Sequence, residues 1–154
     1  MRKLVKILVI LVILITLELA VVTLVKAESG FVYSNTPNNL DSNTLFDLVN
    51  DYRAKLSLKK FVKNDNLCEV AKSREHEMYR EIFVTGRLHS GLYNRNLPYW
   101  VFENLIYEFS EQKALNWWLN SYIHKKTIEN DYKYSCVYCR GLVCTQLFTS
   151  YQPK

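Results

Sequence analysis

Three side chains have the types that metal binding and acid–base chemistry use, namely His89, Glu103 and His124. His89 lies in a polar loop, and His124 follows the tryptophan pair at 117–118. Glu103 lies in an apolar run, where a carboxylate must find partners or shift its pKa. If the three meet, they suit a divalent cation such as zinc, or general acid–base work. Spacing alone does not bring them together, and a purely structural hydrogen-bonded cluster is the plainer alternative.

No recognised nucleophile motif accompanies these residues. The chain contains neither a G-x-S-x-G elbow nor an H-E-x-x-H helix. Ser90 and Ser121 are near histidines in the sequence, but such neighbours are commonplace. His76 lies in a charged run and is predicted to face solvent. The sequence therefore favours binding over catalysis, with the three residues above as its first candidates for either role.

Hydrophobic spacing predicts the helices that would position these residues. Asp41 or Ser42 caps a first helix that runs to Leu56. Asp65 or Asn66 begins a second helix that continues to Ile82, with Arg74 between the residues of its buried face. A third helix is predicted from the cap Ser110 to about residue 120, and a short fourth one at 123–129. Because adjacent helical residues face different ways, one of the two tryptophans is expected in the core and the other near the surface.

The C-terminal part is typical of a β-hairpin. Two strand-like runs, 132–138 and 142–148, flank Cys139-Arg140-Gly141, which suits a three-residue loop with a G1 bulge. Upstream, residues 99–107 are dense in aromatic and β-branched side chains. The simplest expectation for Glu103 within that run is that it points to water, at an edge or out of a turn.

Four cysteines, an even number, favour disulfides in an exported domain. The expected hairpin register places Cys136 opposite Cys144, which predicts the bridges Cys136–Cys144 and Cys68–Cys139. Four cysteines allow three connectivities, and the C-x-x-C spacing of Cys136 and Cys139 leaves a redox or metal role open. A four-cysteine zinc site normally needs a second such pair, which the chain lacks.

Residues 1–27 have the pattern of an export leader. A basic start precedes an apolar run over residues 7–25 and a small-residue exit at Ala27. A cleaved signal peptide and an N-terminal membrane anchor both fit, and either one places the remainder outside the cell. This leader carries +3 of the net charge of +5, so the exported part is only +2. Such a small charge, without a dense basic patch, argues against nucleic-acid partners.

The order of several motifs resembles one known family. These are L-x-x-L-V-N-x-Y-R, L-C-E-V-A-K-S-R-E-H-E-M, a His-Ser loop, E-N-L, W-L-N-S-x-x-H and T-Q-L-F, spread over about residues 40–148. The chain is similar to the CAP superfamily of cysteine-rich secretory proteins, antigen 5 and pathogenesis-related proteins, in its short bacterial SCP-like form. The resemblance implies an α+β fold, a three-layer α-β-α sandwich with a C-terminal β-hairpin.

The resemblance also implies a cleft with two histidines and one or two glutamates. Motif by motif, these correspond to His89, Glu103 and His124, described in some members as a metal site. Ser121 takes the place of a second glutamate found in many members. Phe102 replaces a glycine before Glu103, and Tyr122-Ile123 replaces a Pro-Gly before His124.

These observations predict a leader or anchor at 1–27, a linker at 28–40 and an SCP-like domain at 41–150. The predicted function is a non-catalytic extracellular module that binds a small lipid-like ligand or a partner protein, with zinc or another divalent cation as the only expected cofactor. The alternative is a metal-assisted, peptidase-like hydrolase acting on extracellular or cell-envelope substrates. The protein is expected to be secreted, with membrane contact only through residues 7–25 if they are retained.

Overall fold

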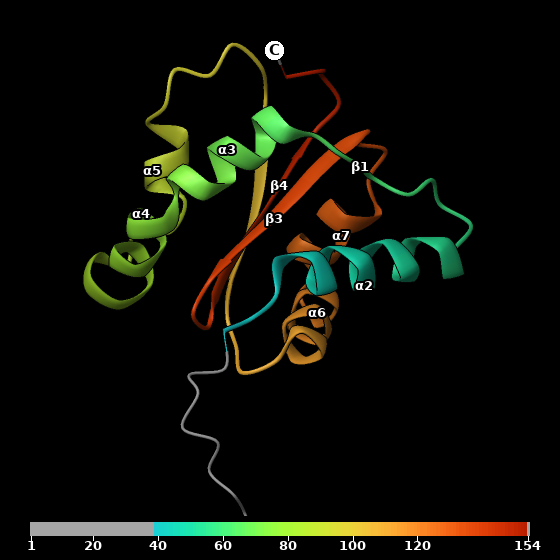
Figure 1. Ribbon diagram of the computed structural model, residues 1–154, viewed down its shortest axis with the longest axis horizontal. Helices are drawn as coiled ribbons and strands as arrows, with labels where there is room; N and C mark the ends of the chain where they lie inside the picture. The colour runs from blue at the N-terminus through green and yellow to red at the C-terminus, as the bar shows by residue number, and fades with distance from the viewer. Residues whose placement is uncertain (1–38, 154) are drawn as a thin grey trace, which may run out of the picture. The chain divides into compact units, whose positions relative to one another are not determined.

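The computed structural model describes residues 39–153 (Figure 1). In chain order the elements are α2 (Ser42–Lys55), β1 (Val62–Lys63), α3 (Asp65–Ser73), α4 (Glu75–Arg80), the π-helical turn η1 (Glu81–Thr85), α5 (Ser90–Tyr93), β2 (Phe102–Tyr107), α6 (Glu111–Asn120), α7 (Tyr122–Glu129), β3 (Tyr134–Arg140) and β4 (Val143–Thr149). The predicted leader and nearly all of the predicted linker lie outside the described residues. Within residues 39–153, no helix has the length and apolar character needed to cross a membrane.

Side-chain caps begin the helices close to the predicted positions. The carboxylate of Asp41 accepts the backbone N–H of Thr44 at 2.7 Å and so caps α2. Ser110 caps α6 through the N–H of Lys113. Helix α3 begins at Asp65, one of the two predicted positions, and its cap is Asn64, whose side chain accepts the N–H of Leu67. Local capping chemistry therefore fixes where these helices start.

The second predicted helix is broken into α3, α4 and η1. The break is at Arg74, whose N–H bonds to the carbonyl of Ala71, three residues back, and so tightens the turn. The resulting bend aims the Arg74 side chain inward, where it is completely buried. Gly86 adopts φ +64 directly after η1, a left-handed conformation that ends the helical segment.

The four strands form one mixed sheet in the order β1-β3-β4-β2. Strands β3 and β4 make the predicted hairpin, but its turn contains two residues, Gly141 and Leu142, because Arg140 pairs with Val143. Only Gly141 has a positive φ, +56, as expected for a type II′ turn. The three-residue loop predicted from the sequence is therefore wrong. Strand β2 pairs antiparallel with β4 and forms an edge of the sheet.

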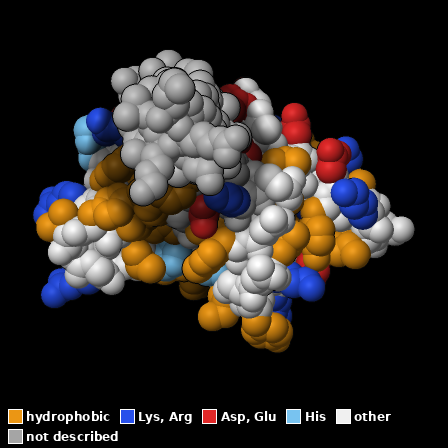
Figure 2. All heavy atoms as spheres, turned by 90° about the horizontal axis from the view of Figure 1, so that it is seen from below, with side chains coloured by type: hydrophobic (Ala, Val, Ile, Leu, Met, Phe, Trp, Pro, Cys, Tyr) orange, Lys and Arg blue, Asp and Glu red, His pale blue; other side chains and the backbone are white. Residues whose placement is uncertain are grey.

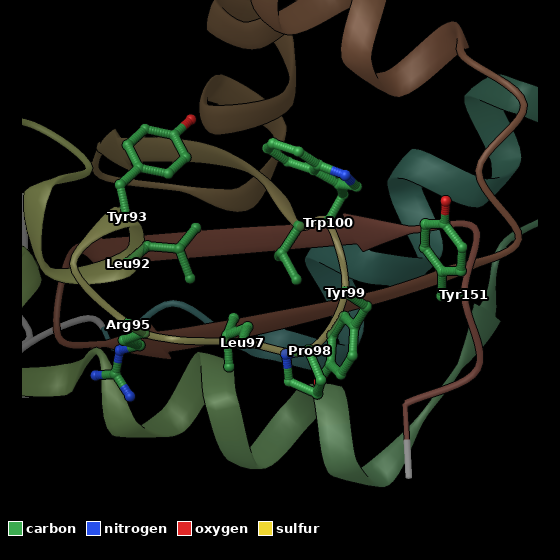
Figure 3. Close-up of a pocket in the computed structure, with 9 residues that line it drawn as sticks. Leu92, Tyr93, Arg95, Leu97, Pro98, Tyr99, Trp100 and Tyr151 are labelled. Atoms are coloured by element: carbon green, nitrogen blue, oxygen red, sulfur yellow. The ribbon is translucent and has the colours of Figure 1, made fainter.

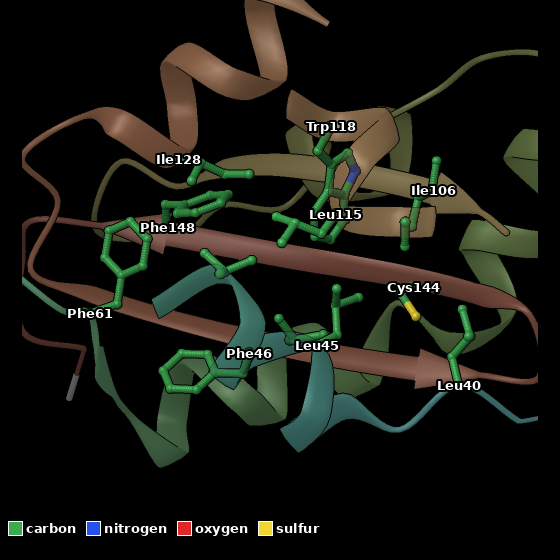
Figure 4. Close-up of a cluster of buried hydrophobic side chains, with 13 residues drawn as sticks. Leu40, Leu45, Phe46, Phe61, Ile106, Leu115, Trp118, Ile128, Cys144 and Phe148 are labelled. Carbon is green, nitrogen blue, oxygen red and sulfur yellow. The ribbon is translucent and has the colours of Figure 1, made fainter. Parts of the chain in front are cut away.

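Helices cover both faces of the sheet and complete three layers (Figure 1). Helices α2, α6 and α7 pack on one face, around a core that includes Leu45, Trp118 and Phe148 (Figure 4). Helices α3 and α4 pack on the other face, where Leu67 and Met78 meet the sheet. The predicted α-β-α sandwich with its C-terminal hairpin is confirmed. Pro37–Lys154 is a compact unit that contains all of these core residues and both disulfides.

Both predicted disulfide pairings are wrong, because the bridges are Cys68–Cys136 and Cys139–Cys144. Strand β3 continues to Arg140 and the turn lies later in the chain than predicted, which shifts the hairpin register by three positions, so that Cys139 lies opposite Cys144 and Cys136 lies opposite Leu147. Residues three apart on a strand point to opposite faces of a sheet. Cys136 therefore points toward α3, which carries Cys68, while Cys139 points away from it. None of the four cysteines is free for a redox or zinc role.

Candidate functional site

A cleft of about 410 Å³ runs along the free edge of β2 and contains both predicted histidines. His89 enters from the layer of α3 and α4, and His124 enters from α7 in the opposite layer. The rest of the lining is mainly apolar and consists of Ile82, Gly86, Leu88, Leu105, Ile106, Tyr107 and Trp117. Figure 2 shows histidine side chains between groups of hydrophobic side chains on this part of the surface. The fold thus brings together two imidazoles that are 35 positions apart in the sequence.

Arg74 organises the polar side of the cleft. Its guanidinium donates to both carboxylate oxygens of Glu81, at 2.8 Å each, and to both oxygens of Glu103, at 3.0 and 3.1 Å. A further bond reaches Glu77 at 2.7 Å. Burial lowers the pKa of Arg74, but the hydrogen bonds that it donates to Glu81 and Glu103 outweigh burial, and the net shift is upward. Arg74 therefore remains a cation that holds three carboxylates in fixed positions.

Glu103 is buried, which corrects the expectation that it points to water. The alternating residues of β2 turn it toward α4, on the same face as Leu105. Burial raises its pKa, yet the hydrogen bonds with His89 and Arg74 outweigh burial and leave the pKa lowered. Its oxygens also accept the hydroxyl of Thr145 at 2.6 Å. Glu103 is therefore an ionised carboxylate whose two oxygens are both fully engaged.

That carboxylate fixes the tautomer of His89. Nδ1 of His89 lies 2.8 Å from Oε2 of Glu103, and an ionised carboxylate can only accept, so Nδ1 carries the proton. In the neutral form of the ring, the second nitrogen, Nε2, then carries the lone pair. Such a carboxylate–histidine pair is the usual support of an imidazole that binds a metal or transfers a proton.

Glu81 holds the backbone of the His89 loop. His89 has φ +67, a left-handed conformation that is unusual for a residue with a side chain. The Glu81 carboxylate accepts the N–H groups of His89 and Gly91, each at 2.7 Å. A Cβ on Gly91 would collide with the guanidinium of Arg74 and the carboxylate of Glu77, so a glycine is required there. Strain at His89 is thus maintained by buried charges rather than by the loop itself.

His124 is held from the opposite layer. Its Nδ1 lies 2.7 Å from the hydroxyl of Ser121, and the Nδ2 of Asn104 donates to its carbonyl at 3.1 Å. Its ring lies 5.0 Å from that of Trp117. Burial, followed by repulsion from the protonated form of His89, lowers the pKa of His124, which favours its neutral imidazole. The two tryptophans divide as predicted, because Trp118 is fully buried in the core and Trp117 faces the cleft.

The donor set fits a two-histidine metal site better than the predicted three-residue set. Within the described residues, no group of three or more His, Cys, Asp or Glu side chains is arranged to hold a metal ion. Glu103 is committed to Arg74, His89 and Thr145, so it can orient a ligand but has no free oxygen to serve as one. The imidazoles of His89 and His124 each use Nδ1 within the protein and leave Nε2 for a ligand.

A second groove, of about 430 Å³, lies beside this site (Figure 3). Its lining includes the exposed rings of Tyr93, Trp100 and Tyr151, with Leu92 beneath them. The ring of Tyr93 lies 6.0 Å from that of His89, so the two hollows are neighbours. None of the three predicted site residues lines this second groove.

Arg74 and Glu81 are the site residues that the sequence did not reveal. A charged residue inside the apolar stripe of a helix was the available signal at Arg74. Glu81, seven positions later, lies on the same side of that helical segment. Their joint role depends on the bend after α3 and on the approach of β2, which residue spacing does not encode.

The fold is that of SCP domains. Among solved structures, the chain is similar to a cysteine-rich secretory protein of Staphylococcus aureus, with a TM-score of 0.60 and 22% identity over 78% of this chain. It is also similar to an extracellular SCP-domain protein of Bacillus anthracis, with a TM-score of 0.57 and 23% identity over 71% of this chain. The chain spans 41% and 40% of the lengths of these two proteins.

A third similar structure is nearly the size of the described domain. It is an outer surface protein of Borrelia burgdorferi, matched with a TM-score of 0.56 and 22% identity over 73% of this chain and 92% of that protein. Neither a protein-family model nor a curated protein matches the chain. At these identities the likeness shows the fold alone, and at that level the resemblance predicted from the sequence motifs is confirmed.

Proposed function

We propose that the protein is an extracellular binding module that takes a small apolar ligand into the cleft along β2. The observation that carries this proposal is the cleft itself, because its wall is mostly apolar and its few polar groups are two imidazoles with unused Nε2 atoms. Its volume of about 410 Å³ lies within the range of small-molecule sites. A ligand with an acyl chain and a polar end would match this distribution.

The extracellular assignment has independent support. Both disulfides are formed, which suits an oxidising compartment, and the first 27 residues have the pattern of a leader. Two of the similar structures are named as an outer surface protein and as an extracellular protein. Retention of residues 7–25 would anchor the module to a membrane, whereas cleavage would release it.

Brominated dodecanoic acid is a direct probe of the cleft, because bromine quenches tryptophan fluorescence on contact. We expect saturable quenching of the wild-type protein that disappears in Trp117→Phe, since Trp117 lines the cleft. Leu88→Asp should weaken binding about tenfold or more, because it removes apolar contact area and adds a charge. Titration followed by tryptophan fluorescence measures both effects.

Trp100→Phe is the matched control for this experiment. Trp100 is exposed in the second groove and away from the cleft, and Trp118 is fully buried. Quenching should survive in Trp100→Phe. Quenching that persists without Trp117 and vanishes without Trp100 would locate the ligand in the second groove and contradict the proposal.

The same cleft is proposed to bind one zinc ion through Nε2 of His89 and His124, with water completing its coordination. Isothermal titration calorimetry should show a single site that is lost in His89→Ala and in His124→Ala. His76→Ala should retain it, because His76 is exposed and does not line the cleft. Glu103→Gln should weaken zinc binding by about 10–100-fold, as expected for a residue that orients a metal ligand. Unchanged affinity in both histidine variants would rule this site out.

A hydrolase is the second candidate, and the Glu103–His89 pair is the observation that favours it. Ser121 lies within hydrogen-bonding distance of His124, but the orienting carboxylate serves the other histidine. The nucleophile–base–carboxylate chain of serine hydrolases is therefore not assembled. Incubation of the protein with peptide and cell-envelope substrates, with and without zinc, distinguishes the candidates. If the protein cleaves a substrate and His89→Ala abolishes that cleavage, the hydrolase function replaces the binding proposal.

A further inference from the structure

The segments that supply Leu88 and His124 to the cleft also carry exposed apolar side chains that the core does not use. We define the apolar rim as Phe83, Val84 and Leu88 on one side and Tyr122 and Ile123 on the other. All five are exposed, with Val84 at 74%, Tyr122 at 77% and Ile123 at 73%. Figure 2 shows hydrophobic side chains on both sides of the histidines on this face.

Local structure explains why these residues face outward. In α7 the buried position is Ile128, so the first turn of the helix carries Tyr122 and Ile123 away from the core. On the other side, the π-helical turn buries Glu81 and leaves Val84 projecting toward solvent. Exposed apolar side chains of this size raise the free energy of the protein in water by roughly 25 cal/mol per Å². Their concentration around one opening therefore points to a partner.

Cations accompany the rim. Arg87 precedes Leu88, and Lys125 and Lys126 follow on the next turn of α7. The Lys126 ammonium lies 5.9 Å from the ring of Tyr122. Arg87 and Lys126 make no ion pair with other described residues, whereas Lys125 lies 3.8 Å from a carboxylate oxygen of Glu129.

Two acidic residues, Glu129 and Glu108, lie on or next to the elements that carry the cleft residues. Glu129 is shared between Lys125 and the hydroxyl of Tyr52. Glu108 accepts the N–H of the adjacent Phe109 and is not among the residues that line the cleft. The rim itself therefore combines projecting apolar groups with unpaired positive charge.

From this combination we propose that the apolar rim docks on the surface of an anionic lipid bilayer. Aliphatic and aromatic tips inserted below the headgroups, with arginine and lysine at headgroup level, are the pattern of interfacial membrane binding. The apolar groups form two separate projections around a hollow, which a fluid headgroup layer can surround more easily than a rigid protein surface can. Docked in this way, the cleft would open directly into the bilayer, from which an acyl chain could enter.

Co-sedimentation of residues 37–154 with vesicles tests this surface without the apolar run at 7–25. The wild-type unit should bind vesicles of equimolar phosphatidylcholine and phosphatidylglycerol more strongly than vesicles of phosphatidylcholine alone. The double variant Val84→Ser/Ile123→Ser should partition at least about tenfold more weakly onto both. Arg87→Gln/Lys126→Gln should reduce binding to the anionic vesicles only, and added salt should have the same effect.

Trp100→Ser is the matched control, because Trp100 is 76% exposed but lies in the second groove. It should bind vesicles as the wild type does. A loss of vesicle binding equal to that of the double variant would show that exposed apolar side chains bind vesicles wherever they lie, and would overturn the proposal. Absence of wild-type binding to either vesicle would also overturn it, as would self-association through the rim in sedimentation velocity. Val84 and Ile123 do not line the cleft, so zinc titration of the double variant separates failure of this surface from failure of the proposed function.

Discussion

Replacement of Arg74 by methionine is expected to lower the free energy of unfolding by about 3–5 kcal/mol, which is the typical result of removing one partner from a buried ion pair. The side chain is fully buried and bonds to Glu77, Glu81 and Glu103. Methionine fills a similar volume but leaves these carboxylates without their cation. For a domain of this size, the melting temperature should fall by roughly 10–20 °C, measured by circular dichroism.

The pH dependence of the free energy of unfolding distinguishes the loss of the Arg74 ion pairs from a loss of packing. In the folded protein, burial raises the pKa values of Glu77, Glu81 and Glu103, but hydrogen bonds outweigh burial and lower all three below the ordinary 4.5. Arg74 donates to each of them, together with Arg95 at Glu77, backbone N–H groups at Glu81 and His89 at Glu103. Their stabilising effect is therefore complete above pH 4.5 and is lost as the pH falls through the lowered values. Without Arg74, burial and mutual repulsion raise the carboxyl pKa values, so that protonation stabilises the folded state. The difference in stability between wild type and Arg74→Met should therefore shrink as the pH approaches about 4.5.

Two further variants serve as controls that can contradict this prediction. Arg74→Lys retains the charge but cannot bond to both carboxylates in the forked manner of arginine, so an intermediate loss is expected. Arg95→Met removes another cation bonded to Glu77, but Arg95 is partly exposed and should contribute less than about 1 kcal/mol. Two results would contradict the role assigned to Arg74. One is an equal loss of unfolding free energy in Arg74→Met and Arg95→Met, and the other is a difference in stability between wild type and Arg74→Met that does not vary with pH.

The sequence was most informative where local chemistry decides the structure. The caps Asp41 and Ser110, the apolar stripe of α2 and the alternative orientations of Trp117 and Trp118 all depend on neighbours within a few residues. His89 and His124 were found because residue type and motif order singled them out. Their shared cleft follows from the fold rather than from spacing, because they come from opposite layers and meet only at the edge of β2.

The errors concern contacts between distant segments. Glu103 was expected in water because its partner, Arg74, is 29 positions away and reaches it only through the bend after α3. The position of the hairpin turn decided the cysteine pairing, since a turn at Gly141 and Leu142 instead of residues 139–141 shifts every cross-strand partner by three positions. In both cases the missing information was the relative placement of two elements, which propensity and periodicity do not determine.

Removal of the Cys68–Cys136 disulfide is the second change expected to have a large effect. Its cysteines are separated by 68 positions and join α3 to the central strand β3. In the loop-entropy model, a closed loop of that length stabilises the folded state by about 4 kcal/mol. The double variant Cys68→Ala/Cys136→Ala should lose about that amount in urea unfolding, while the alanines largely preserve local packing.

The Cys139–Cys144 disulfide provides the matched comparison. It spans only 5 positions, for which the same model gives about 2 kcal/mol, and the Gly141 turn and the β3–β4 register already hold its ends together. Cys139→Ala/Cys144→Ala should therefore cost less than the first double variant, and the reverse order would contradict the argument from loop length. Mass spectrometry of a non-reduced digest tests the connectivity itself. Peptides joined as Cys136–Cys144 and Cys68–Cys139 would require a three-residue hairpin turn, and with it a shift of β4 that turns Thr145 away from Glu103.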